Sequence, residues 1–130
     1  GLISWFSKLV AAQLTGIPWM LALAVLLLAY MYSHYAFASL SAHVTAMYAA
    51  FLAVAVGVGA PPFLAAMGLG VISALFGSLT HFATGPAPIY FGAGYIPQGT
   101  WWRLGFIMSV VNLIVFIGIG GLWWKLIGLW

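Results

Sequence analysis

Apolar residues form runs long enough to lie in a lipid bilayer, separated by polar or glycine- and proline-rich breaks. The longest run, Gly105 to Trp124, has 20 residues without a charged side chain. A helix needs about 20 residues to cross roughly 30 Å of hydrocarbon. Arg103 precedes the run, Lys125 follows it, and tryptophans lie at both ends, where aromatic belts usually occur. The pattern predicts a C-terminal transmembrane helix over residues 104–128.

Two shorter apolar runs, Trp19 to Tyr32 and Val44 to Val56, flank a stretch rich in serine and histidine. Because each run is shorter than a full crossing, residues 17–56 are predicted to form a re-entrant helical hairpin. Its tip would lie at the polar stretch. A continuous helix through that stretch is the alternative, because serine and alanine are tolerated in bilayer helices.

A further apolar run begins at Phe63 and is broken after Leu79 by a segment that contains Gly85 and Pro86. Proline lacks the backbone donor that a regular helix needs, so residues 62–95 are predicted to form a discontinuous transmembrane helix. Non-helical backbone at membrane depth is tolerated only where it is buried in protein or lines a cavity. A break at that depth is therefore a candidate binding site.

The first 15 residues show a different pattern. Apolar side chains recur there at helical spacing, with Ser4, Ser7 and Lys8 on another side. This predicts an amphipathic helix over residues 1–15 that lies in the membrane interface. The four predicted elements together make an all-α, polytopic membrane protein.

Composition supports this interpretation. The 130 residues are 66% hydrophobic, with three basic residues and no acidic residue, whereas about 25% of residues in soluble proteins are charged. So few charges cannot solvate the surface of a soluble globule. The basic residues are scattered and form no patch for nucleic acid. A soluble domain and a nucleic-acid binder are therefore excluded, and the lipid bilayer is the expected surrounding.

The available side chains also limit the chemistry. Without aspartate or glutamate the chain lacks carboxylate pairs, triads and carboxylate cages for hard cations. It has no cysteine nucleophile or thiolate ligand either. The three histidines are not at metal-binding helical spacing, so hydrogen-bonded imidazoles are favoured over metal ligands. We expect neither an enzyme nor a metal site.

Uncharged polar groups and backbone dipoles remain. In discontinuous membrane helices, half-helix N-termini bind anions and freed carbonyls coordinate small cations. Two interruptions fit this pattern, the turn around Ser39 and Ser41 and the break from Ala83 to Pro88. Structural roles are the alternative at both, because the serines suit a helix–helix contact and the Thr84 hydroxyl suits its own broken backbone.

Three segments carry a resemblance to a known family. They are YMYSHYAFASLSAHVTAMY (30–48), LTHFATGPAPIYFGAGYIPQGTWW (79–102) and RLGFIMSVVNLIVFIGIGGLWWKLIGLW (103–130). They resemble the C-terminal end of the divalent anion:sodium symporter family, in the branch of citrate carriers and plastid 2-oxoglutarate/malate translocators. The likeness covers essentially the whole chain, and the A-T-G-P-A-P-I-Y-F-G-x-G-Y run is fairly specific.

The resemblance implies a longer carrier of two inverted repeats, in which this chain is most of the second repeat. The missing N-terminal half would supply the rest of the substrate site, and the intact carrier would be a homodimer. The implied activity is transport of a di- or tricarboxylate anion by alternating access. The implied location is a bacterial inner membrane, with the plastid inner envelope as the other possibility.

The resemblance also implies a site. Hairpin tips in the family carry Ser-Asn-Thr, whereas this region has Ser39-Leu40-Ser41 or Ser41-Ala42-His43. The expected substrate-binding residues are Ser39, Ser41, His43, Thr84, Gly85 and Pro86. The backbone of Ala83 and Thr84 would bind Na⁺ if Na⁺ is the coupling ion, and no other cofactor is expected. Loss of the asparagine favours carboxylate exchange over sodium symport.

The hairpin tip is expected near Thr84 and near the middle of the helical bundle. Two other classes of function remain open. One is a non-transporting membrane subunit or packing module that is complete at this length. The other is an ion channel, which lacks support because the sequence has no ring of charges and no carbonyl-filter motif.

Overall fold

The computed structural model describes residues 5, 9–10, 12–13 and 16–130, and regular structure in these residues is entirely helical. The elements in chain order are α2 (Trp19–Ser33), the 3₁₀ turn η1 (His34–Ala36), α3 (Leu40–Gly57), α4 (Pro62–Leu75), the 3₁₀ turn η2 (Phe76–Ser78), α5 (Ala87–Gly92), α6 (Gln98–Leu113), the π-helix η3 (Ile114–Gly120) and α7 (Gly121–Leu126). The amphipathic helix predicted over residues 1–15 lies mostly outside the described residues.

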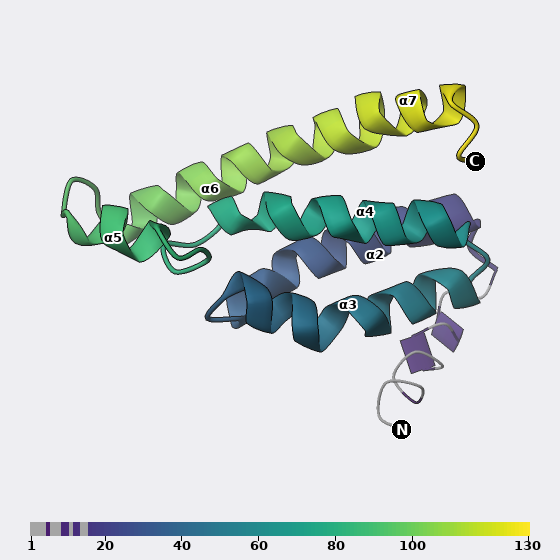
Figure 1. Ribbon diagram of the computed structural model, residues 1–130, viewed down its shortest axis with the longest axis horizontal. Coiled ribbons are helices and arrows are strands. Elements are labelled where there is room, and N and C mark those ends of the chain that lie inside the picture. Colours follow the sequence, from purple (N-terminus) through teal and green to yellow (C-terminus); the bar gives the residue numbers. More distant parts are fainter. Residues whose placement is uncertain (1–4, 6–8, 11, 14–15) are drawn as a thin grey trace.

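Three described helical stretches are long and apolar enough to cross a membrane, namely Trp19–Ala36, Leu40–Gly57 and Gln98–Leu126. The all-α, polytopic membrane fold is thereby confirmed. In Figure 1, α2, α3 and α4 pack together, and the continuous stretch from α6 to α7 runs along α4. The short α5 extends beyond the end of this bundle.

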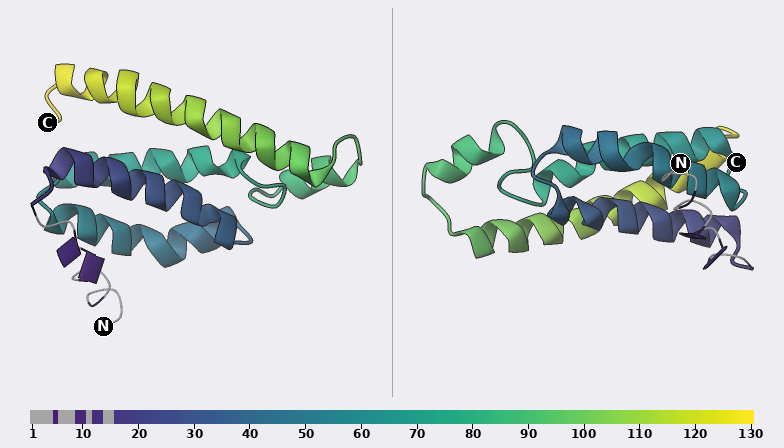
Figure 2. Two further views of the ribbon diagram at one scale, coloured as in Figure 1. Left: turned by 180° about the vertical axis from the view of Figure 1, so that it is seen from behind. Right: turned by 90° about the horizontal axis from the view of Figure 1, so that it is seen from below.

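Helices α2 and α3 are antiparallel and meet at a short turn, as both views in Figure 2 show. Ser39 ends the turn in an extended conformation, and its Oγ accepts a hydrogen bond from the Ala42 amide at 3.2 Å. This is an N-cap, which satisfies one of the free amides at the start of α3. The polar stretch therefore separates two helices. Because each is long enough to cross a bilayer, their re-entrant placement stays a prediction.

Helix α4 starts on two prolines, Pro61 as N-cap and Pro62 in the first turn, where a missing amide proton has no cost. It ends at Leu75 and passes through η2 into irregular backbone over residues 79–86. After α5, Gly94 adopts a φ of 77°, a left-handed conformation that favours glycine. This turn sends the chain back into α6.

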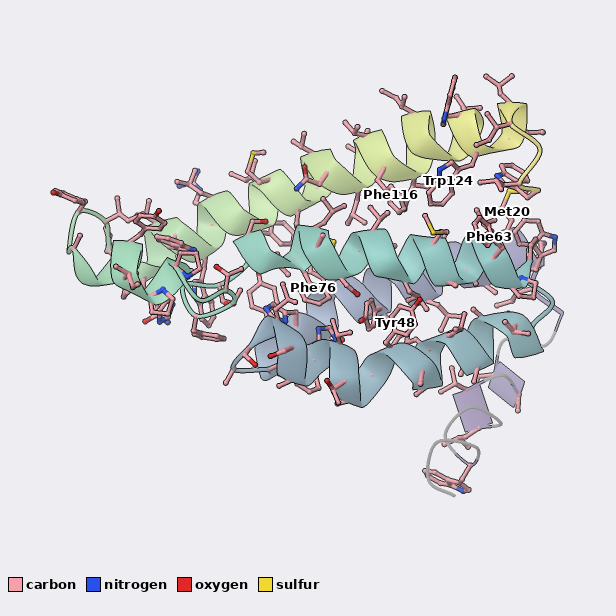
Figure 3. All side chains as sticks on the ribbon, viewed as in Figure 1. Met20, Tyr48, Phe63, Phe76, Phe116 and Trp124 are labelled. Atoms are coloured by element: carbon pink, nitrogen blue, oxygen red, sulfur yellow. The ribbon has the colours of Figure 1, made fainter. Side chains whose placement is uncertain are left out.

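The core lies between α2, α3 and α4, and Figure 3 shows Phe76 at its end next to the turn. Polar groups inside it are paired across helices. The Ser73 hydroxyl donates to the Leu69 carbonyl at 2.8 Å, so the Tyr30 hydroxyl, 2.9 Å away, donates to Ser73. The Tyr48 hydroxyl donates to the Ala66 carbonyl at 2.9 Å. Such bonds hold apolar helices together in lipid, where helix association gains nothing from the hydrophobic effect.

Helix α6 joins the bundle through a backbone contact. Gly105 is buried, and a Cβ atom placed on it would lie 2.5 Å from the Ser78 carbonyl oxygen and 2.8 Å from the Leu79 carbonyl oxygen. One helical turn further, Ser109 Oγ lies 3.0 Å from the Tyr32 hydroxyl. These contacts hold α6 against α2 and against the backbone at the end of η2.

Candidate functional site

The turn between α2 and α3 meets the break that follows α4. The Leu40 amide donates a hydrogen bond to the Ala83 carbonyl at 3.1 Å. Next to it, a Cβ atom on Gly77 would lie 2.9 Å from Thr84 Cγ2 and 3.6 Å from Leu40 Cδ1. The expected proximity of the turn to Thr84 is therefore observed. The turn lies at the end of the three-helix bundle, not near its middle, because α4 stops there (Figure 1).

The start of α3 offers groups that suit an anion. The Leu40 and Ala42 amides are used by Ala83 and by the Ser39 side chain. The Ser41 amide has no hydrogen-bond acceptor among the described residues. Ser41 is exposed, and its Oγ lies 3.4 Å from the Oγ of Ser39. An amide and two hydroxyls at a helix N-terminus match the requirements of an oxyanion.

The break contributes mainly backbone. Ala83 is fully buried and Thr84 is half-buried, whereas Gly85 and Pro86 are exposed. The Ala83 carbonyl accepts from the turn, and the Thr84 carbonyl accepts from the first amide of α5 at 3.3 Å. A carbonyl oxygen has two lone pairs, so each oxygen keeps one for a cation. Carbonyl oxygens are the kind of ligand that coordinates Na⁺ in such transporters. Two carbonyls alone, however, are only a partial ligand set.

His43 lies behind the turn instead of on its exposed side. Its Nε2 is 3.0 Å from Ser33 Oγ, and its Nδ1 is 3.3 Å from His34 Nδ1. The ring packs against three aromatic rings, those of Tyr30, Phe37 and Phe76, at centroid distances of 4.7, 4.5 and 4.6 Å. Two residues rotate a helix by about 200°, so His43 points into the core where Ser41 points out.

A second aromatic cluster packs against the other side of the break. The Trp102 Nε1–H donates to His81 Nδ1 at 3.1 Å. The His81 ring also packs on Phe91, with centroids 4.4 Å apart. The cluster links residues from the break, α5 and α6. No local spacing rule relates positions 21 residues apart, so this pairing has no sequence signal.

A cavity of about 360 Å³ lies away from the break, between α2, α4 and the α7 end of the last helix. Its lining is apolar and aromatic and includes Met20, Phe116 and Trp124 (Figure 3). It offers no cluster of hydroxyls or amides for a charged ligand. The turn and the break are therefore the candidate site.

Comparison with known proteins identifies the family. The whole chain, residues 1–130, matches the family described as the sodium:sulfate symporter transmembrane region. The chain is 53% identical over its full length to dicarboxylate transporter 1, chloroplastic, of Spinacia oleracea and covers 23% of that protein. It is 57% identical over its full length to a putative malate transporter of Bacillus subtilis (strain 168), covering 27% of it. An L-tartrate/succinate antiporter of Escherichia coli (strain K12) is 38% identical, over 95% of this chain and 26% of that protein.

The chain thus spans about a quarter of the length of the curated relatives it matches. Its apolar helices and its relatives identify an integral membrane protein. The resemblance to divalent anion:sodium symporters is confirmed, and the relatives are transporters, not enzymes. The chain belongs to the sodium:sulfate symporter family of membrane proteins.

Proposed function

We propose that this chain forms the part of a larger membrane carrier that holds a di- or tricarboxylate between the α2–α3 turn and the helix break. The hydrogen bond from Leu40 to Ala83 carries the proposal, because it joins a helix N-terminus to irregular backbone at one place. The carboxylates in the names of the relatives, malate and L-tartrate/succinate, support the substrate class. The carrier works by alternating access, as a homodimer in a bacterial inner membrane or a plastid inner envelope.

One carboxylate group of the substrate binds at the turn. The Ser41 amide and the hydroxyls of Ser39 and Ser41 donate to it, and the positive end of the α3 dipole adds a favourable potential. Thr84 donates from the opposite side, with Gly85 and Pro86 lining the space. No acidic side chain of this chain repels the anion. A positive counter-charge for the substrate is expected from the part of the carrier that lies outside this chain.

Removing the two hydroxyls tests the site. In the whole carrier reconstituted in liposomes, we expect Ser41→Ala and Thr84→Ala each to raise KM for labelled malate or citrate about tenfold or more. Each variant loses a hydrogen bond to a charged group, worth about 1.5–3 kcal/mol. Ser78→Ala is the matched control, because that hydroxyl donates to the Leu75 carbonyl of its own turn. Unchanged kinetics in both test variants would refute the site, and absence of any carboxylate transport would refute the function.

The proposed transport mode is exchange of one carboxylate for another, without Na⁺. The Ala83 and Thr84 carbonyls accept one backbone hydrogen bond each and alone form only a partial ligand set for Na⁺, which supports this choice. We expect malate-for-malate exchange in liposomes to keep its rate when Na⁺ is replaced by choline on both sides. A rate that falls with Na⁺ concentration and recovers when Na⁺ is restored would instead establish sodium symport. Replacement of K⁺ by choline at the same ionic strength controls for a non-specific effect of removing an alkali cation.

A further inference from the structure

Hydrogen bonds behind the turn fix the positions of the imidazole protons. The Ser33 hydroxyl donates its one proton to the Tyr30 carbonyl at 2.8 Å. Ser33 Oγ must therefore accept from His43 Nε2–H, 3.0 Å away. His43 Nδ1, without a proton, accepts from His34 Nδ1–H at 3.3 Å. The remaining nitrogen, His34 Nε2, is therefore unprotonated and is a free acceptor at the end of this series of hydrogen bonds.

This nitrogen is buried and has no hydrogen-bond partner among the described residues. His34 is fully buried, and its ring stacks on Phe76 with centroids 4.3 Å apart and an interplanar angle of 20°. A buried polar atom without a partner is rare, and a bound ligand or a functional role is one of the explanations for it. The smallest ligand that an imidazole lone pair binds is a proton.

The surroundings of the pair lack a negative charge. Helix α2 contributes Tyr30, whose ring is 4.7 Å from that of His43. The turn contributes Phe37 and η2 contributes Phe76, neither of which is ionisable. The sequence contains no aspartate or glutamate. An isolated buried charge is costly, so an imidazolium at this position requires an anion from outside the chain.

We propose that the His34–His43 pair binds one proton together with each carboxylate anion that binds at the neighbouring turn, so that the carrier moves both. This inference rests on the proposed function. The proton binds at His34 Nε2, while His34 Nδ1–H continues to donate to His43. The Phe76 ring face stabilises the cation.

The anion supplies the missing negative charge. Ser39 is the N-cap of α3 and His43 lies four residues later, which is about 6 Å along the helix axis. The His34 ring, which carries the charge, stacks on the His43 ring with centroids 5.3 Å apart. Opposite charges separated by about 10 Å still attract in a protein interior. The coupling is reciprocal: a bound anion favours proton uptake, and a bound proton favours anion binding to the same degree.

His34→Asn tests the inference. Its amide nitrogen can still donate to His43, but it has no second ring nitrogen to bind a proton. In weakly buffered detergent solution near pH 7, where both malate carboxylates are ionised, we expect the unmodified whole carrier to take up a proton as malate binds. Over the pH range in which the free pair is neutral and the malate-bound pair carries the proton, the Kd for malate should rise about tenfold for each unit increase in pH. In His34→Asn, proton uptake and this pH dependence should both disappear.

His81→Asn is the matched control, because the third histidine belongs to the Trp102 cluster, and it should retain proton uptake. His34→Gln provides a second variant without an ionisable group, should His34→Asn fail to fold. Malate binding by the unmodified carrier without proton uptake overturns the inference, as does proton uptake that persists in His34→Asn or His34→Gln. Failure of the unmodified carrier to bind any carboxylate overturns the proposed function as well, which distinguishes the two failures.

Discussion

Replacing Phe76 by alanine is expected to lower the free energy of unfolding by about 3–5 kcal/mol, the usual range for a large aromatic residue in a core. Phe76 is fully buried at the point where α2, α3 and η2 meet (Figure 3). Its ring contacts those of Tyr30, His34 and His43, with centroids 5.7, 4.3 and 4.6 Å away. The substitution leaves a cavity beside two buried imidazoles, and the rigid helices around it cannot close on that space.

The effect is measurable as a shift in the denaturant or thermal unfolding of the whole carrier in detergent. Phe63→Ala is the control on α4, because the Phe63 side chain is 60% exposed and its removal creates no internal cavity. We expect that variant to change stability by less than about 1 kcal/mol. Equal losses in Phe63→Ala and Phe76→Ala would show that Phe76 does not organise the core.

Replacing Gly105 by alanine is expected to separate α6 from the rest of the bundle. The added Cβ would meet two carbonyl oxygens, those of Ser78 and Leu79, at 2.5 and 2.8 Å. Backbone atoms cannot rotate away as a flexible side chain does, so the helix itself must shift. Overpacking of this kind costs about 1–3 kcal/mol, and more where the surroundings are rigid.

Thermal unfolding in detergent again provides the measurement. The control is Gly70→Ala in α4, where an added Cβ meets no heavy atom within 4 Å. Alanine is a better helix former than glycine by up to about 1 kcal/mol, so this variant should be unchanged or more stable. A Gly105→Ala carrier as stable as the unmodified one would mean that α6 does not make this backbone contact.

The transmembrane stretch around α6 was accessible from sequence because hydropathy over a long run is decided by transfer into lipid and needs no partner helix. The start of this helix could not be predicted in the same way. Hydropathy predicts it near residue 104, whereas α6 begins at Gln98, directly after Pro97, whose backbone is extended. A search for apolar runs does not detect a helix whose first turn is polar. The first residue of a helix also depends on the local backbone conformation.

The sequence also indicated both halves of the candidate site but not how they meet. The bond between Leu40 and Ala83 uses only backbone groups, which nearly every residue carries, so it has no compositional signal. His43 illustrates a second limit: its neighbours in sequence are at the turn, but the helical rotation directs its ring toward His34. The same limit applies to the π-helix over Ile114–Gly120, whose residues read as ordinary transmembrane sequence.

The bond from Leu40 to Ala83 has a consequence for observing the carrier at work. An amide proton exchanges with deuterium only when its hydrogen bond opens. The Leu40 amide therefore exchanges only in conformations in which the turn has parted from the break. Its exchange rate, followed with and without substrate, records how often the two halves of the site separate, with no label attached to either.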